Sequence, residues 1–419
     1  MARWLKRDSS LGFAVQSDYT TVQTSGFNYL LAGDDVSVDV ARDLQQTQLL
    51  EGSWGASSAP AVGSKHGGKI KFKIPLRSCK VAYDPTSDLI SANLPPEFSL
   101  LAIALGSGSA NALFNHLYGA GDVDTFSPTV IGTNTGSYTT GQFFCAASDT
   151  AGTNLVTGWI KSQSGASLTL FEATATPASD PTNVYPTSTA CLTSTQPSPL
   201  TIHYVGSNAA LGYVLVGCVC ESASLTLGAR QVPVLELSYS FTSHTRSATV
   251  GGLQIPAGYE RVQPSIGVKG ARLTLGGVAT DGVGDLKLTY TATHSYIDSH
   301  NALQGVAECI VTSKTVKISC TVPIDSTDTL TNGSSPYETK LEQGTTVNGL
   351  CLTTGTQPGK ILSIFCPAVR VSAQPKLVDK GGFLCEQLEF EAAAYAADGT
   401  SPTTVDAAPA DSVFRIALA

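Results

Sequence analysis

Residues 67–76 read Gly-Gly-Lys-Ile-Lys-Phe-Lys-Ile-Pro-Leu, so lysines alternate with large apolar residues. This period of two is typical of a β-strand with one solvated face and one buried face. Residues 313–324, Ser-Lys-Thr-Val-Lys-Ile-Ser-Cys-Thr-Val-Pro-Ile, repeat the pattern and end in the same apolar-Pro-apolar step. Further alternating runs lie at 235–241, 286–290 and 388–392. Short segments of this kind, separated by Gly, Asp, Asn and Pro, predict a mainly β fold of antiparallel sandwich or barrel type.

A short helix is predicted after each of the two proline-ended strands. Pro-Pro-Glu at 95–97 supplies a prolyl start and an acidic first turn, and Gly106 ends the apolar run that follows. Ser-Pro-Tyr-Glu at 335–338 is a capping box, and Gly344 closes the segment. A further short helix is expected over 109–118. The chain is therefore expected to be mainly β, with one or two helices in each half.

The order strand, helix, strand, strand occurs twice along the chain. Residues 214–218 of the first half correspond to 361–366 of the second, and a further alternating strand follows in each half. This internal repeat predicts two antiparallel β-domains, 1–255 and 256–419, each with a short helix. The first is longer by a Thr/Ser/Gly/Asn-rich insertion at about 120–200, which we expect to be a β-rich subdomain at the surface.

Composition and charge exclude several classes of protein. The chain has 419 residues, of which 42% are hydrophobic, so each of two or three domains of ~150 residues can bury a core. The formal net charge is −8, whereas electrostatic binding of nucleic acid or a membrane surface needs clustered Lys and Arg. The first residues lack the apolar core of a secretory signal, and no apolar run approaches the roughly 18 residues of a membrane span. A cytoplasmic protein is expected. Charged residues are only 14%, which suits outer faces covered by copies of the same chain.

The ten cysteines are expected to be small buried hydrophobes. Cys145, Cys320 and Cys366 each sit among apolar strand neighbours. A chain of this length does not depend on disulfides, and the absence of a Cys-x-x-Cys pair gives zinc little support. No cofactor or metal is predicted.

Motifs for catalysis are absent or poor, and we do not expect an enzyme. The segment 106–110, Gly-Ser-Gly-Ser-Ala, lacks the Gly-x-Ser-x-Gly spacing of a nucleophile elbow and follows a helix. His294, Asp298 and His300 could form a metal cluster, although a solvated strand end is the simpler interpretation. The acidic stretch 34–43 lacks the spacing of a calcium loop.

Several segments together resemble the major tail tube protein of long-tailed bacteriophages. Residues 11–19 are similar to the start of those proteins, and 49–54 through 65–69 resemble their long polar loop and the strand after it. Residues 213–227 are similar to their paired carboxy-terminal strands, and 411–418 to their terminal strand.

The resemblance implies a structural role in a virion tail. The chain is about twice as long as a single tube domain, so together with the internal repeat the resemblance implies two tube domains in one polypeptide. Such proteins close as homotrimers with six domains in each ring, and the rings stack into the conduit for DNA ejection. The implied partners are copies of the chain, a tape-measure protein inside the tube, and terminator and tip proteins at its ends. Assembly is expected in the host cytoplasm, with no membrane involved.

Two surfaces are candidates for this role. The polar loop 45–68 carries one large apolar anchor, and we expect it to reach the adjacent ring; the simpler alternative is a surface loop with no partner. Its candidate stacking residues are Leu50, Glu51, Trp54, Lys65 and His66. A tube that passes DNA should not hold phosphates with Lys and Arg, so an acidic or neutral lumen is expected. The candidate lumen-facing acids are Asp34, Asp35, Asp39, Glu389 and Glu391.

Two alternatives from other classes stay open at this point. One is a phage receptor-binding or adhesive β-protein with the 120–200 insertion as its carbohydrate site. Sugar sites favour stacked aromatic rings, and Trp159, the only tryptophan of the insertion, gives this alternative little support. The other is a capsid or decoration protein.

Overall fold

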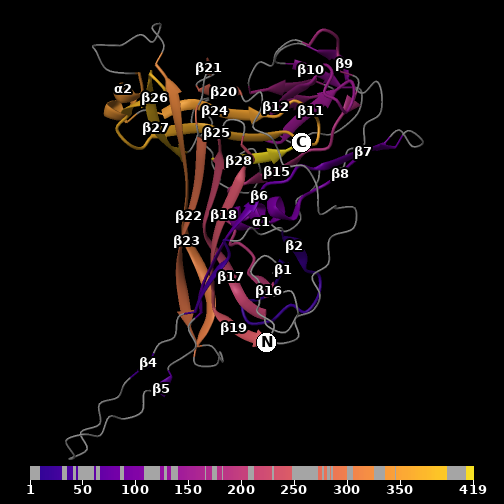
Figure 1. Cartoon of the computed structure of the whole chain (residues 1–419). Helices are drawn as coiled ribbons and strands as arrows, with labels where there is room; N and C mark the ends of the chain where they lie inside the picture. Colours follow the sequence, from indigo (N-terminus) through magenta and orange to yellow (C-terminus); the bar gives the residue numbers. More distant parts are fainter. Residues whose placement is uncertain are drawn as a thin grey trace, which may run out of the picture.

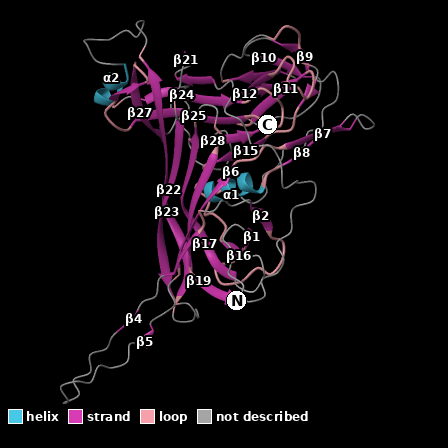
Figure 2. Ribbon diagram, in the orientation of Figure 1, coloured by secondary structure: helices cyan, strands magenta, loops and turns pink. Residues whose placement is uncertain are grey.

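The protein is built mainly of antiparallel strands, which confirms the predicted mainly β class (Figure 1, Figure 2). Among the residues that the structure describes, eighteen strands belong to one hydrogen-bonded network, and six others form a separate sheet. The computed structural model describes residues 10–30, 35–40, 44–45, 61–62, 67–84, 89–107, 123–126, 130–133, 140–165, 167–171, 177–181, 183–205, 212–228, 231–247, 272–275, 278–280, 284, 286–299, 305–324, 336–344, 346–393 and 412–419.

The first half of the chain supplies eight strands and one helix to the main body. They are β1 (Ser10–Val15), β2 (Asn28–Leu30), β3 (Ser37–Val40), β6 (Gly68–Pro75), α1 (Pro96–Leu105), β16 (Leu200–Val205), β17 (Gly212–Leu227), β18 (Val234–Phe241) and β19 (Ser243–Ser247). Two short ladders project from it, and these are β4 (Leu44–Gln45) with β5 (Ala61–Val62), and β7 (Lys80–Asp84) with β8 (Leu89–Asn93).

The second half supplies the matching set. Its elements are β20 (Arg272–Leu275), β21 (Val278–Thr280), β22 (Leu286–Asp298), β23 (Val306–Pro323), α2 (Pro336–Gln343), β24 (Thr346–Thr354), β25 (Leu362–Val371), β26 (Lys376–Lys380), β27 (Phe383–Ala393) and β28 (Arg415–Leu418). The predicted helices over 95–106 and 335–344 are confirmed, whereas the one expected over 109–118 lies outside the described residues. Neither described helix is long and apolar enough to cross a bilayer.

The two sets have the same topology. The pairings β1–β2, β1–β16, β3–β6 and β6–β18 recur as β20–β21, β20–β24, β22–β23 and β23–β27. The pairings β16–β17 and β17–β19 recur as β24–β25 and β25–β28. The pairing of β17 with β18 recurs as two pairings, β25–β27 and β26–β27, so β25 and β26 together correspond to the long strand β17. The internal repeat inferred from the sequence is therefore a repeat of topology. The proposed boundary between 255 and 256 lies outside the described residues.

The two repeats join edge to edge through the pairing of β17 with β22, which we call the in-chain seam. Each repeat contributes a four-strand unit, or quartet, and the quartets follow one another as β3-β6-β18-β17 and β22-β23-β27-β26. The carboxy-terminal β28 also pairs with β15 (Ser188–Cys191) of the first half. One hydrophobic core contains residues of both halves, so they pack as a single body.

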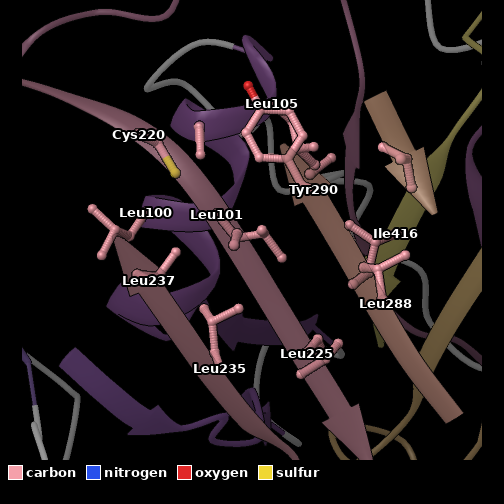
Figure 3. Packing of buried hydrophobic residues seen from close by; sticks show 14 of the residues in the cluster. Leu100, Leu101, Leu105, Cys220, Leu225, Leu235, Leu237, Leu288, Tyr290 and Ile416 are labelled. Atoms are coloured by element: carbon pink, nitrogen blue, oxygen red, sulfur yellow. The ribbon is translucent and has the colours of Figure 1, made fainter. Parts of the chain in front are cut away.

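The joined quartets have one apolar face, which is covered. Side chains from both quartets point toward α1 in Figure 3, where Leu100, Leu101 and Leu105 of the helix face the sheet. Nine of the ten residues of α1 are buried, as expected for a helix that is apolar on all sides. Each fully buried Leu, Ile or Phe contributes about 1.5–3 kcal/mol, so burial of this face stabilises the body. Gly106, with φ of 89°, ends the helix in the left-handed conformation that favours glycine.

The long strand β17 passes from one layer of the first repeat to the other. Its beginning pairs with β16 and β19, and its later part pairs with β18 and β22. The change occurs at Gly217, whose φ is 66° and where a Cβ would lie 2.4 Å from Thr242 Oγ1. Glycine is required because a side chain would be strained and would clash. The Gln16 side chain accepts a hydrogen bond from the Gly217 amide at 2.8 Å, which fixes the bend.

The insertion forms its own six-stranded sheet, in the order β14-β11-β12-β13-β10-β9. Its strands are β9 (Val123–Phe126), β10 (Val130–Thr133), β11 (Phe143–Ala147), β12 (Val156–Ser164), β13 (Ser167–Leu170) and β14 (Asn183–Val184). Trp159 anchors this sheet to the second repeat, because its Nε1 donates a 2.9 Å hydrogen bond to Ser363 Oγ. Its ring lies between Phe143 and Phe365, with centroids 5.2 and 5.5 Å away. The insertion of one repeat therefore rests on the other.

Candidate assembly surface

The joined quartets present a polar face opposite the apolar one, which we call the open face. Along β6, for example, Lys69, Lys71 and Lys73 are exposed while Ile70 and Phe72 are buried. The basic side chains of the open face on the inner strands are Lys69, Lys71, Lys73, Lys287 and Lys317, and the acidic ones are Glu221, Glu236, Glu389 and Glu391. A sheet with one packed and one solvated face is typical of antiparallel structure.

Charges of opposite sign lie next to one another on the open face. Lys69 Nζ is 2.9 Å from Glu221 Oε2, across strands that are not neighbours in sequence. In register, Lys317 lies opposite Glu391. Exposed pairs of this kind contribute only about 0–1 kcal/mol each, so they do little for stability. Their effect is to leave the face close to electrically balanced.

The predicted lumen-facing acids lie on this surface where they are described. Asp35 precedes β3 and its Oδ2 is 3.5 Å from Lys73 Nζ, and Asp39 of β3 lies opposite Lys69. Glu389 and Glu391 of β27 lie on the face away from the fully buried Leu388 and Phe390, as the alternation indicated; Asp34 lies outside the described residues. The acids do not form an acidic patch, because lysines lie opposite or beside them on neighbouring strands of the open face.

The candidate stacking residues Leu50, Glu51, Trp54, Lys65 and His66 lie outside the described residues. What is described of this region is the two-residue ladder of β4 and β5, in which Leu44 lies opposite Val62. In Figure 1 this ladder lies beyond the end of the long β22–β23 hairpin, well away from the body.

Both outer edges of the joined quartets are open in the described part of the chain. There β3 pairs with β6 alone, and β26 pairs with β27 alone. The β26–β27 hairpin exposes three large apolar side chains, Leu377 at 65%, Phe383 at 72% and Leu384 at 55%. Open strand edges with exposed apolar residues are sites where another chain can pair, and monomeric proteins usually protect them.

The other candidates from the sequence have structural roles or lie outside the description. His294 is half-buried, and its Nε2 lies 3.1 Å from the Cys220 carbonyl oxygen. Asp298 ends β22, and His300 lies outside the described residues. Within the described ranges no three His, Cys, Asp or Glu side chains gather as a metal site would need. All ten cysteines are buried and none of them is in a disulfide, and their burial is as expected of small hydrophobes.

The alternative of a carbohydrate site in the insertion loses its aromatic platform. Trp159 is only 1% exposed and its indole is used in packing and in the bond to Ser363. A ring in that position cannot stack on a sugar from solvent.

Two buried polar groups were not indicated by the sequence as pairs or sites. Arg77, just after β6, donates from Nη2 to Oε1 of Glu97 in the first turn of α1, and both side chains are almost fully buried. Burial raises the pKa of Glu97, against the lowering effect of the Arg77 guanidinium. His203 of β16 is 4% exposed and stacks on Phe27 with centroids 3.9 Å apart, and burial lowers its pKa to about 4. Of these residues, the sequence indicated only Glu97, as an acid in the first turn of a helix.

The sequence matches no protein-family model and no curated protein sequence.

Proposed function

We propose that this chain is a structural protein that assembles head to tail into closed rings, which stack into a tube of the kind found in phage tails. The observation that carries the proposal is the in-chain seam, where one quartet continues into a second quartet of identical strand order. A protein that already joins two of its repeats edge to edge has the contact from which a ring can be built. The segments that resemble tail tube proteins support the same conclusion.

A ring is the natural closure of this contact. Head-to-tail contacts are heterologous, so they give a closed ring when the rotation at each step divides the circle and an open helix when it does not. If the contact between chains repeats the contact within the chain, every step has the same rotation. Six quartets then come from three chains, and a homotrimer with pseudo-sixfold symmetry follows.

The balanced charges of the open face suit a conduit for DNA. Each phosphate neutralised by Lys or Arg adds affinity that depends on salt, and a lumen lined by unpaired lysines would retain the genome. On the open face Lys69 and Lys73 lie within ion-pair distance of Glu221 and Asp35. We therefore assign the open face to the lumen. A tape-measure protein inside the tube, terminator and tip proteins at its ends, and a place in the virion tail belong to the same proposal.

Negative-stain electron microscopy of the purified chain over a range of concentrations tests this function. We expect stacked annuli of uniform bore, with threefold or pseudo-sixfold averages along the axis. Sixfold rings made of six whole chains would keep the tube and refute the trimer. Discrete particles without a bore at every concentration would refute the proposal, and glycan binding would then be the next property to measure.

A deletion separates ring formation from stacking. If the segment around Trp54 contacts the adjacent ring, removal of residues 46–66 should leave soluble rings that no longer polymerise. A deletion of residues 85–88, which link β7 to β8, serves as the control. Tubes of normal length from the 46–66 deletion would show that this segment has no stacking role.

A further inference from the structure

The in-chain seam supplies a template for the contact between two copies, and this inference rests on the proposed function. At the seam β17 and β22 are antiparallel, with Ser224 opposite Thr289 and Leu225 opposite Leu288. The serine and threonine lie on the open face, whereas the two leucines are buried beneath it. The seam therefore continues both the polar face and the apolar face from one quartet to the next.

The topological repeat identifies which residues of β26 occupy the positions of β17. Matching the prolines that end β6 and β23 places Gln387 of β27 at the position of Glu236 of β18. Gln387 lies opposite Lys376 of β26, and Glu236 lies opposite Ser224 of β17. Lys376 to Val378 of β26 thus corresponds to 224–226 of β17.

The same match identifies β3 with β22. It places Lys69 of β6 at the position of Lys317 of β23. Lys69 lies opposite Asp39 of β3, and Lys317 lies opposite Thr289 of β22, so Asp39 corresponds to Thr289. The edge of β22 that contacts β17 within the chain corresponds to the edge of β3 that is open in the described structure.

We infer that β26 of one copy pairs with β3 of the next copy, antiparallel, with Lys376 opposite Asp39 and Leu377 opposite Val38. The partner is a second copy of this chain, and the register is that of the in-chain seam.

Charge and burial fit the inferred register independently. Lys376 and Asp39 are both exposed on the open face, and the register brings opposite charges together. Four residues further along, the same register places Lys380 opposite Asp35, a second pair of opposite sign. Cross-strand pairs of opposite charge stabilise a sheet, whereas like charges in the same place destabilise it. Leu377, now 65% exposed, would be covered by the half-buried Val38.

A cysteine pair tests the register directly. Residues directly opposite in an antiparallel pair have Cα atoms ~4.5–5.5 Å apart, within the ~4.4–6.8 Å span of a disulfide. The variant Lys376→Cys with Asp39→Cys should therefore form disulfides between copies when assembled protein is oxidised mildly. The ten native cysteines are all buried, so they give little background. Denaturing, non-reducing electrophoresis should show covalent oligomers up to the closed ring, which reductant returns to monomer.

Matched variants define the controls. Lys376→Cys alone and Asp39→Cys alone should stay monomeric on the gel. Lys376→Cys with Ser37→Cys is shifted by two residues, and its Cα atoms would be roughly 7–8 Å apart, so it should cross-link far less. All the substituted side chains are exposed, and circular dichroism checks that each variant is folded.

The outcomes separate this inference from the proposed function. Rings that cross-link only through the in-register pair support the inferred contact. Rings that form but do not cross-link, or that cross-link best through the shifted pair, overturn the contact and leave the ring in place. A wild-type chain that forms no rings refutes the proposed function, and the inferred contact fails with it.

Discussion

The buried ion pair between Arg77 and Glu97 should be the most sensitive polar contact in the body. It links the end of β6 to the first turn of α1, the helix that covers the apolar face of the quartets. Replacing Arg77→Met keeps most of the side-chain volume and removes the charge. Glu97, which is 0% exposed, would then be a buried carboxylate without its guanidinium.

The expected loss of stability depends on whether Glu97 stays charged or takes up a proton in the variant. Removing one partner of a buried ion pair typically costs about 3–5 kcal/mol. The carboxyl can avoid burying its charge by taking up a proton. At pH 7 this costs roughly 1.4 kcal/mol for each pH unit above its unfolded pKa of about 4.3, or roughly 3.8 kcal/mol. Burial already raises the pKa of Glu97 in the wild type, so part of this cost is present before the substitution. We therefore expect Arg77→Met to lower the free energy of unfolding by at most about 3–4 kcal/mol at pH 7.

The sign of the pH dependence is specific to this mechanism. In the variant the folded pKa of Glu97 lies far above the unfolded value, so folding takes up a proton and the penalty grows as pH rises above about 4.3. Urea unfolding of wild type and variant at pH 4.5 and pH 7 measures it, and the difference between the two proteins should be small at pH 4.5. A loss below 1 kcal/mol at pH 7, or an equal loss at both pH values, would contradict the burial of this pair. Arg77→Met with Glu97→Leu removes both partners and should be more stable at pH 7 than Arg77→Met alone.

Three further changes probe the insertion, a buried imidazole and the contact between copies. Trp159→Ala should destabilise the protein by about 3–5 kcal/mol and make the insertion susceptible to protease. Ser363→Ala removes only the partner hydroxyl and should cost about 1 kcal/mol, so equal losses in urea unfolding would argue against packing of the indole. Burial lowers the pKa of His203 to about 4, so the unfolded state takes up a proton first and the free energy of unfolding should fall as pH drops below about 6.5. His203→Phe should flatten this part of a plot of unfolding free energy against pH, and an unchanged plot would assign the acid sensitivity to another group. Lys376→Glu should turn an attraction of ~0.2–1 kcal/mol into a similar repulsion, which raises the concentration needed for rings about 2- to 30-fold for each contact; adding Asp39→Lys should recover part of the loss in sedimentation velocity, and no recovery would show that the two residues do not meet.

The sequence could predict the elements and their repetition because these depend on local patterns. Alternating charge and bulk at 69–74 identified β6 and the face that it buries. The helix from Pro96 to Gly106 followed from the residues at its ends, and both are used as expected. Prolines at corresponding strand ends, Pro75 and Pro323, were part of the pattern of strands and helices that indicated the repeat.

The seam and the buried pairs could not be predicted because they depend on which strands become neighbours. The alternation of Leu225 and Leu288 shows that each strand has a buried side, but both would be buried equally well beside another strand. Glu97 was recognisable as an acid in a helical first turn, whereas its partner Arg77 lies 20 residues away across the β7–β8 hairpin. The packing of Trp159 could not be predicted either, because nothing near it in sequence reveals the second repeat on which it packs.

Carrying both repeats on one chain frees each from having to match its twin. The first repeat holds an apolar helix that is buried on every side, whereas the second holds a polar helix that is partly exposed. The six-stranded insertion interrupts the first. In a ring of single-domain subunits, any mutation appears at all six positions, including those where it clashes. In a ring of three such chains, selection can decorate alternate positions outside while the inner wall keeps six near-equal steps, so the outer surface and the bore can evolve with different symmetries.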